Sequence, residues 1–404
     1  MADRMEPMRR FRFDDVVVEE TAHDFQNVLA DAHRRRIRPL CLCLEPGVPM
    51  YIARVADQYL VKRMPLSGGG HDPACSSYEP PDDLSGLGAL IGNAIQVDAE
   101  TGVCALKVGF SLTKVGTRAS QIAESSGSDT VVGETRKLSL RSMLNYLWHQ
   151  AELTAWTSRW AGKRYWWNIR WHLIEAAGQM TVKGGPLSGV LFVPEAFRAA
   201  DKPAIEQRRA TALAGALPPR TGPRKLMILV GEIKKFEPAR NGHKMLIKHL
   251  PDFPFMLDDK LHSRLQARFE SEFALSDADG ESHLLAIATF GLTPAGLATV
   301  EEMAVMVTTE NWVPYESAYE KKLIDALAGV RERSVKGLRY ALAPDAPIAS
   351  VLLQKLPQPV ALYIVPPTAD DEYEEELRSL IASRPEIDAW IWRIAKGGMP
   401  RLPL

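Results

Sequence analysis

Helix and strand patterns alternate along the chain in an order that predicts a multidomain α+β protein. Apolar residues recur at helical spacing from Ala22 to Ala32, and strand patterns follow at Pro49–Arg54 and Tyr59–Met64. Another strand is expected from Ala105 to Leu112. The stretch 118–134 is rich in Ser, Gly and Thr and lacks periodicity, so we expect a linker there.

The segment from Arg136 to Gly189 has a different pattern. Apolar residues between Leu140 and Ala151 step by three and four, which predicts an amphipathic helix with Ser139 as its N-cap. A second helix is expected over Arg164–Ala177, and a strand follows at Gly189–Val193. Two helices followed by a strand are typical of a winged-helix-like unit.

The second half of the chain follows an Ala-, Pro- and Arg-rich connector at 199–223. Two apolar runs flank Asn241-Gly242, a dipeptide that favours a tight hairpin turn. A helix is expected from Asp258. Further strands are expected at Leu284–Phe290, Val305–Thr309, Ser334–Leu338, Ile348–Leu353 and Val360–Val365, with helices at Glu316–Leu327 and Glu372–Ala382. These patterns predict four domains, at 1–117, 135–198, 224–310 and 311–404.

Composition narrows the class of protein. The hydrophobic fraction of 46% and the charged fraction of 25% are those of a soluble globular protein. The net charge of −1 means that any nucleic-acid partner must meet local basic patches. The longest uncharged apolar run, Leu284 to Val300, contains Gly and Pro and is short for a bilayer span. The N-terminus lacks the apolar region of a signal peptide, so we expect a cytoplasmic protein without a membrane partner.

Three of the four cysteines fall in one window together with a histidine. Cys41 and Cys43 are two residues apart, and His71 and Cys75 follow after 27 intervening residues. On a strand, both thiols of the first pair would face one point, and Leu40, Leu42 and Leu44 would face a small core. Three thiols and an imidazole form a Cys3His set, which Zn²⁺ uses in closed tetrahedral structural sites.

Two other interpretations of these cysteines stay open. Free Cys is among the most buried residue types, so the thiols could simply be core residues, and a redox pair is a further alternative. Such a clustering of cysteines argues for a reducing compartment rather than a disulfide framework. Cys104 lies apart from the others and is interpreted as a core residue.

Basic and aromatic residues are interleaved between Arg136 and Gly189. This segment has eight Lys or Arg against two Glu, and it contains six of the nine tryptophans. Such residues can pair with phosphates and stack on bases, although aromatic stripes at helical spacing are usually core. A run of arginines also precedes the first cysteine pair. The nucleic-acid contacts that we expect are Arg34, Arg35, Arg36, Arg159, Lys163, Arg164, Trp167, Arg170 and Trp171.

Several stretches resemble an uncharacterised bacterial family, that of domain of unknown function 1173. They are the sequence from Cys41 to Arg54, Lys62 to Pro65, His71 to Cys75, Gly231 to Lys234, Ile247 to Asp252 and Thr309 to Trp312. The family is noted for three N-terminal cysteines and is often encoded on plasmids and integrating conjugative elements. The paired cysteines also resemble the SWIM type of zinc finger, but here the second pair has the order His-x3-Cys.

The C-terminal region resembles restriction-endonuclease-like folds of the PD-(D/E)xK class in the order of its elements. That resemblance implies a divalent-metal nuclease, for which Glu320 would be the helix carboxylate. The strand positions, Ala349-Ser350-Val351 and Tyr363-Ile364-Val365, lack carboxylates to hold the metal, so we predict no catalytic residues.

The sequence therefore predicts a zinc-ribbon-like N-terminal domain, a winged-helix-like domain, an α+β unit and a degenerate nuclease-like domain. Its expected function is that of a zinc-containing, nucleic-acid-binding accessory protein of a mobile element, with DNA favoured over RNA. The alternatives are a metal-dependent nuclease and a structural subunit that binds a protein through the acidic run Asp370 to Glu376.

Overall fold

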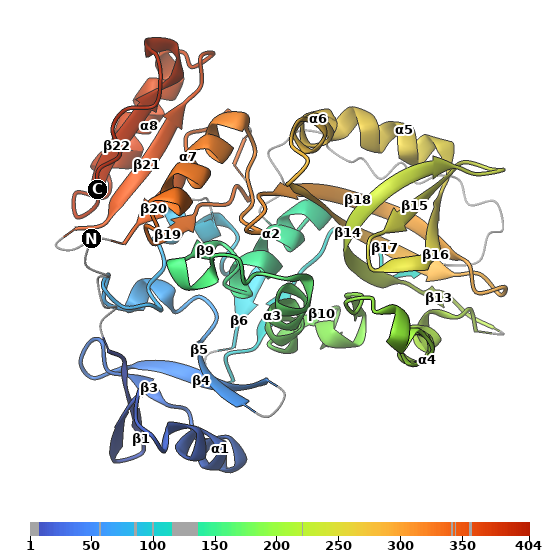
Figure 1. Ribbon diagram of the computed structural model, residues 1–404, viewed down its shortest axis with the longest axis horizontal. Coiled ribbons are helices and arrows are strands. Elements are labelled where there is room, and N and C mark those ends of the chain that lie inside the picture. The colour runs from blue at the N-terminus through green and yellow to red at the C-terminus, as the bar shows by residue number, and fades with distance from the viewer. Residues whose placement is uncertain are drawn as a thin grey trace.

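The computed structural model describes residues 8–55, 58–84, 87–98, 101–114, 136–219, 221–340, 342–343, 345–354 and 358–404. A small N-terminal lobe, a β-barrel and a C-terminal αβ lobe surround a central pair of helices (Figure 1). The linker that we expected at 118–134 lies outside the described residues. No helix in the described part of the chain is both long and apolar enough to cross a bilayer.

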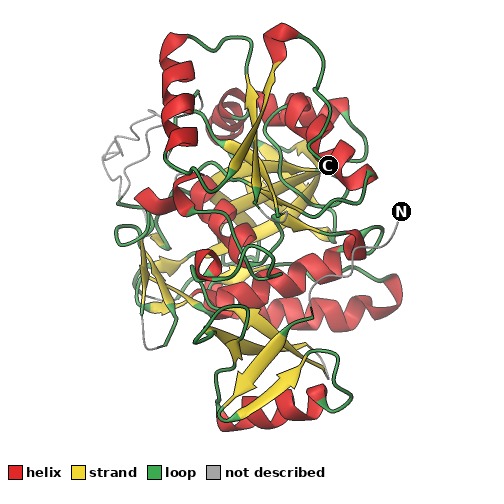
Figure 2. Cartoon of the chain, turned by 90° about the vertical axis from the view of Figure 1, so that its left-hand side faces the viewer, coloured by secondary structure: helices red, strands yellow, loops and turns green. Residues whose placement is uncertain are grey.

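The N-terminal lobe is a five-stranded sheet with the order β2-β1-β3-β4-β5. Its helix α1 lies across one face (Figure 2) and buries Phe25, Leu29 and Ala32 in the lobe's core. The expected hairpin is confirmed as β4 and β5, but the β1–β2 hairpin has no counterpart in the sequence prediction. The elements are β1 Arg10–Phe13, β2 Val16–Glu19, α1 Phe25–Arg35, β3 Leu40–Cys41, β4 Val48–Val55 and β5 Gln58–Arg63.

The centre of the molecule contains two helices and a four-stranded sheet with the order β11-β10-β7-β6. Ser139 caps α2 as expected, because its Oγ accepts a hydrogen bond from Ser142 N at 3.1 Å. The hairpin β10–β11 directly follows α3. The elements are β6 Ile95–Val97, β7 Cys104–Leu106, α2 Leu140–Gln150, α3 Trp166–Gly178, β10 Met180–Val182 and β11 Gly185–Pro186.

The barrel closes because β14 pairs with both β15 and β17. The ring runs β14-β15-β16-β18-β17 and back to β14, and β16 and β18 are parallel while the other pairs are antiparallel. Two helices connect the third strand to the fourth. The elements are β14 Met227–Pro238, β15 His243–Ile247, β16 Leu250–Leu257, α5 Asp259–Arg268, α6 Glu270–Ala278, β17 His283–Leu292 and β18 Ala298–Thr308.

The connector that we expected at 199–223 is largely helical, which corrects the sequence prediction. Helix α4, Lys202–Leu213, occupies most of it and lies below the barrel in Figure 1. Its Ile205 and Leu213 are buried. Of the four prolines in this stretch, Pro203 stands in the first turn of α4, where a missing N–H is tolerated, and the other three follow the helix.

The C-terminal lobe has the element order α7-β19-β20-β21-α8-β22. Its sheet has the order β22-β21-β20-β19-β9, in which β21 and β22 are parallel. The edge strand β9, Ala155–Trp156, comes from the centre of the chain. The remaining elements are α7 Ala318–Gly329, β19 Ser334–Lys336, β20 Ala349–Leu353, β21 Val360–Val365, α8 Asp371–Ala382 and β22 Asp388–Arg393.

The buried residues do not divide at the domain boundaries that the sequence predicted. One continuous core joins Leu87, the central helices, the barrel and Tyr340, so 135–198 and 224–310 share their interior. Tyr78 and Leu84, which we placed in the N-terminal domain, pack in the C-terminal core. The winged-helix-like segment is therefore no separate folding unit.

Candidate metal centre and candidate nucleic-acid surface

The structure brings Cys41, Cys43, His71 and Cys75 together in the N-terminal lobe. One ligand atom from each residue lies within 4.8 Å of every other. The backbone route differs from our expectation: β3 ends at Cys41, and Cys43 lies in the turn that follows. Because the chain leaves the extended conformation there, Leu44 is 44% exposed rather than packed in a small core.

Three distances within this cluster are close to those of a tetrahedral site. Sγ of Cys41 is 3.8 Å from Sγ of Cys75. Nδ1 of His71 is 3.3 Å from Sγ of Cys43 and 3.7 Å from Sγ of Cys75. Metal–sulfur bonds of about 2.3 Å and metal–nitrogen bonds of about 2.0 Å require S–S separations of about 3.8 Å and S–N separations of about 3.5 Å. The donor set and its geometry are therefore compatible with a bound metal ion.

The surroundings of the cluster favour a thiolate at Cys75, whereas burial raises the pKa of the Cys43 thiol. Ser77 N donates to Sγ of Cys75 at 3.4 Å. A backbone group of Cys43 bonds to the thiol of Cys41, and a backbone group of Asp72 bonds to the thiol of Cys43. The hydrogen bond from Cys41, together with His71, lowers the pKa of Cys75 to about 3. The same hydrogen bond and burial raise the pKa of Cys41. Metal ligands must be deprotonated, so a preformed thiolate assists binding.

The loop that carries His71 and Cys75 also contacts the C-terminal lobe. Arg333 donates to the carbonyl of Ser76 at 2.7 Å, and Gln354 donates to the carbonyl of Tyr78 at 2.7 Å. On the other side, a cavity of about 300 Å³ lined by the three cysteines, Arg9 and Asp72 leads to the cluster. A cavity thus reaches the cluster from one side, and the loop that carries two of its members contacts the C-terminal lobe.

Arg164, which we expected to contact nucleic acid, is buried, and this corrects the prediction. Its guanidinium donates to the carbonyls of Leu153 at 3.1 Å and Asn311 at 3.0 Å, and also to that of Ala155. Burial lowers its pKa to about 9. A side chain only 6% exposed and bonded to three backbone carbonyls is not accessible to a phosphate.

The other basic residues that we expected to contact nucleic acid differ in their exposure and in their partners. Arg170 is half-buried and donates to the carbonyl of Val193 at 3.0 Å. Arg34 and Arg35 are exposed at the end of α1 and pair with Asp31. Arg36 ends that helix in a left-handed conformation. These pairs agree with a solvated helix terminus. Arg159 and Lys163 are exposed near the start of α3.

The tryptophans divide between core and surface within one turn of α3. Trp166 is buried, donates to the carbonyl of Pro194 at 2.8 Å and stacks on His249. Trp167 is 54% exposed, and Tyr165 is 58% exposed. Trp171 is half-buried, with the ammonium of Lys62 5.6 Å from its ring centroid. Helical spacing could not separate these neighbours, because which face is covered depends on the rest of the fold.

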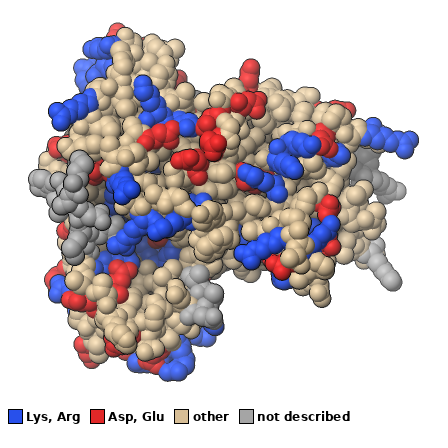
Figure 3. Space-filling model, viewed as in Figure 1, with Lys and Arg blue, Asp and Glu red and all other residues tan. Residues whose placement is uncertain are grey.

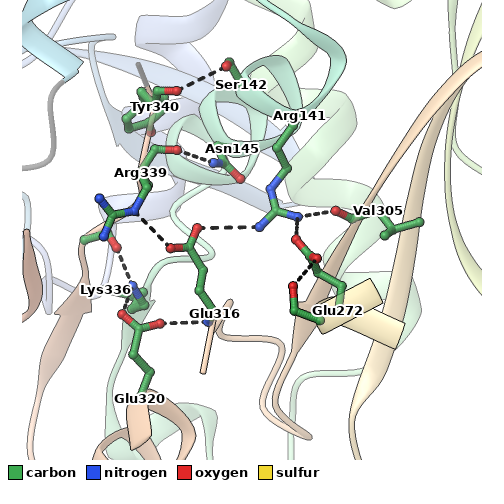
Figure 4. Close-up of polar contacts among 12 residues, drawn as sticks. Arg141, Ser142, Asn145, Glu272, Val305, Glu316, Glu320, Lys336, Arg339 and Tyr340 are labelled. Carbon is green, nitrogen blue, oxygen red and sulfur yellow. Dashed lines mark hydrogen bonds and ion pairs between the residues drawn. The ribbon is translucent and has the colours of Figure 1, made fainter. Parts of the chain in front are cut away.

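A network of charged side chains connects α2 to the C-terminal lobe (Figure 4). No pattern in the sequence indicated this network. Glu316 lies 3.6 Å from the guanidinium of Arg141 and 3.3 Å from that of Arg339. Glu320 pairs with Lys336 at 3.0 Å and accepts a hydrogen bond from the backbone of Glu316 at 2.8 Å. Both partners of the second pair are buried, so Glu320 is committed to a structural ion pair.

Comparison with known proteins gives a family but no named activity. No curated protein and no solved structure matches the chain. Residues 11–395 match the family described as protein of unknown function (DUF1173), and they include all four members of the cysteine–histidine cluster. The chain belongs to that family.

Proposed function

We propose that this protein is a zinc-containing accessory protein that binds single-stranded nucleic acid, with DNA favoured over RNA, and has no catalytic activity. The service of a mobile element is part of the same proposal. The observation that carries the binding function is the exposure of Tyr165 and Trp167 beside Lys163 at the start of α3. Single-stranded bases offer their faces to such rings, whereas duplex bases do not.

The solvation of the exposed aromatic rings of Tyr165 and Trp167 supports this proposal. A large aromatic ring in water gives up the free energy that its burial would provide, so two half-exposed rings within three residues offer a surface that a partner can cover with a gain in free energy. Each base stacked on an aromatic side chain contributes about 1–3 kcal/mol. Lys163 and Arg159 lie in the same loop and can neutralise phosphates. The half-buried Arg170 lies on the next turn of α3.

The barrel supports the same proposal at the level of fold. It is a closed five-stranded barrel of Greek-key type, the architecture of the OB-fold, which binds oligonucleotides in many proteins. A shared architecture does not assign a function by itself, so this support is an analogy. The face drawn in Figure 3 carries basic side chains interspersed with acidic ones, as expected for local rather than global attraction.

Zinc has a structural part in this proposal. Four protein ligands complete a tetrahedron, so no position remains for water or substrate. The metal would fix the loop from His71 to Tyr78, which Arg333 and Gln354 hold against the C-terminal lobe. We therefore assign the site to the alignment of two lobes rather than to chemistry.

Fluorescence anisotropy with a labelled oligothymidylate tests the binding function. Trp167→Ala is expected to weaken binding by about 5- to 150-fold, which corresponds to the loss of one stacked base. Tyr319→Ala is the matched control, because Tyr319 is an exposed aromatic residue on α7 in the C-terminal lobe. An unchanged affinity for Trp167→Ala, or no binding by the unmodified protein to DNA or RNA, would overturn the proposal.

The nuclease alternative has support from topology alone. The C-terminal order α7-β19-β20-β21-α8-β22 agrees with the restriction-endonuclease-like resemblance. Its helix carboxylate, Glu320, is however buried against Lys336 and cannot hold an external metal in this conformation. Magnesium-dependent cleavage of DNA that is lost in Glu320→Gln would favour the nuclease over the binding protein.

A further inference from the structure

The four-stranded central sheet borders an open concavity of about 730 Å³. Its walls come from three separate segments: the strands β6 and β7, the β10–β11 hairpin, and the two residues that open the segment before α2. Small or short side chains form the floor, among them Ala105, Thr181 and Gly184. The polar residues on its walls are Asn93, Gln96, Lys107, Arg136, Lys137 and Lys183.

The charge in this concavity is of one sign. Lys107, Arg136, Lys137 and Lys183 line it, and no Asp or Glu does. Within the described part of the chain, none of these four has a salt-bridge partner. Lys183 donates to the carbonyl of Phe110 at 2.9 Å and, outside the concavity, its charge acts on the carboxylate of Glu302. By contrast, Arg164 and Arg170 on α3 are committed to backbone carbonyls, and Lys62 is paired with Glu152.

The backbone holds these cations in place. Leu138 N donates to the carbonyl of Lys107 at 2.8 Å, and Gly109 N donates to the carbonyl of Leu138 at 2.9 Å. Lys183 and Gly184 form the two-residue turn between β10 and β11, both with positive φ, the conformation that a type I′ hairpin turn requires. The four charges therefore come from a fixed framework rather than from a mobile tail.

We propose that this concavity holds the phosphate backbone of single-stranded DNA. The inference rests on the proposed function and adds a second, electrostatic surface to the aromatic one. Four cations on a concave wall that no Asp or Glu lines match a chain that carries one negative charge per nucleotide, and the amides of Asn93 and Gln96 can donate to further phosphate or sugar oxygens. One phosphate ion would leave most of these charges unmatched.

The test measures the salt dependence of DNA binding by the full-length protein. One variant combines Lys107→Gln, Arg136→Gln, Lys137→Gln and Lys183→Gln. A matched control removes four exposed charges elsewhere, by Lys260→Gln, Arg264→Gln, Lys396→Gln and Arg401→Gln. The slope of log K against log salt is expected to become shallower by about 3 in the first variant, since each single-strand phosphate contact contributes about 0.7. In the control it is expected to change by less than about 1.

The outcomes separate this inference from the proposed function. If the unmodified protein binds no oligonucleotide, both fail. If it binds, and the salt slopes of the concavity variant and the control change equally, the concavity does not hold DNA, while the proposal for the aromatic surface is unaffected. Binding of inorganic polyphosphate without binding of oligothymidylate would also overturn it. All four concavity residues are exposed, so the concavity variant should unfold at the same temperature as the unmodified protein. If it unfolds at a lower temperature, the salt slopes of the single variants Lys107→Gln and Lys183→Gln are measured instead.

Discussion

At the scale of the residue, the most specific feature is the convergence of three thiols and one imidazole. The sulfurs of Cys43 and Cys75 lie near Nδ1 of His71, and the sulfur of Cys41 lies near that of Cys75, at distances close to those around a tetrahedral metal. The fourth cysteine, Cys104, is buried far from them in sequence and lies 3.2 Å from the hydroxyl of Tyr146. Cys104 therefore serves as a control for substitutions of the three clustered cysteines.

Replacement of one ligand is expected to remove the metal. The unmodified protein should contain about one zinc per chain, whereas Cys43→Ser should lose it, because removal of a thiolate leaves an incomplete tetrahedron. Cys104→Ser should retain the metal. Elemental analysis of the purified proteins measures this. Equal zinc content in both variants, or none in the unmodified protein, would contradict the site.

At the scale of the element, α3 shows how one helix serves two environments. Trp166, Ile169 and Leu173 face the shared core, while Trp167 faces solvent. The two adjacent tryptophans differ only in the direction in which the helix carries them. The structural role of α3 and its proposed binding role are therefore separable by mutation.

Stability measurements should distinguish the two tryptophans. Trp166→Ala is expected to lower the free energy of unfolding by about 3–5 kcal/mol, because it opens a cavity in the core. Trp167→Ala should change it by less than about 0.5 kcal/mol, as for an ordinary surface substitution. Urea unfolding followed by circular dichroism provides the values. Similar losses in both variants would mean that Trp167 is a core residue.

At the scale of the whole molecule, ion pairs connect the N-terminal lobe to the centre. Lys62 on β5 reaches Glu152, which follows α2, at 2.7 Å, and Arg63 pairs with Glu79. Burial by itself would raise the pKa of Glu152, but the charges of Lys62 and Arg63 lower it from 4.5 to about 2. The lobe is therefore attached by charges as well as by apolar contact.

This attachment should depend on pH in a defined window. Because the pKa of Glu152 is lower in the folded state, its contribution to stability is complete above pH 4.5 and is lost as the pH falls toward 2. The difference in urea midpoint between the unmodified protein and Glu152→Gln should therefore be constant above pH 5 and shrink below pH 4.5. The control is Glu281→Gln, which removes a carboxylate from an exposed position. A pH-independent difference for Glu152→Gln would refute the linkage.

Local patterns in the sequence determined many of the helices and strands and the four residues of the cysteine–histidine cluster. The Ser139 cap, the hairpin around Asn241-Gly242 and the CxC and HxxxC pairs depend on residues within a few positions of one another, so a short window is enough to find them. Tertiary structure alone decided which residues are free to bind. It buried Arg164, exposed Trp167, closed the barrel through β14 and β17, and gathered four cations from three segments around one concavity. Those outcomes depend on contacts between residues far apart in the chain, and burial and charge pairing are settled only when such contacts form.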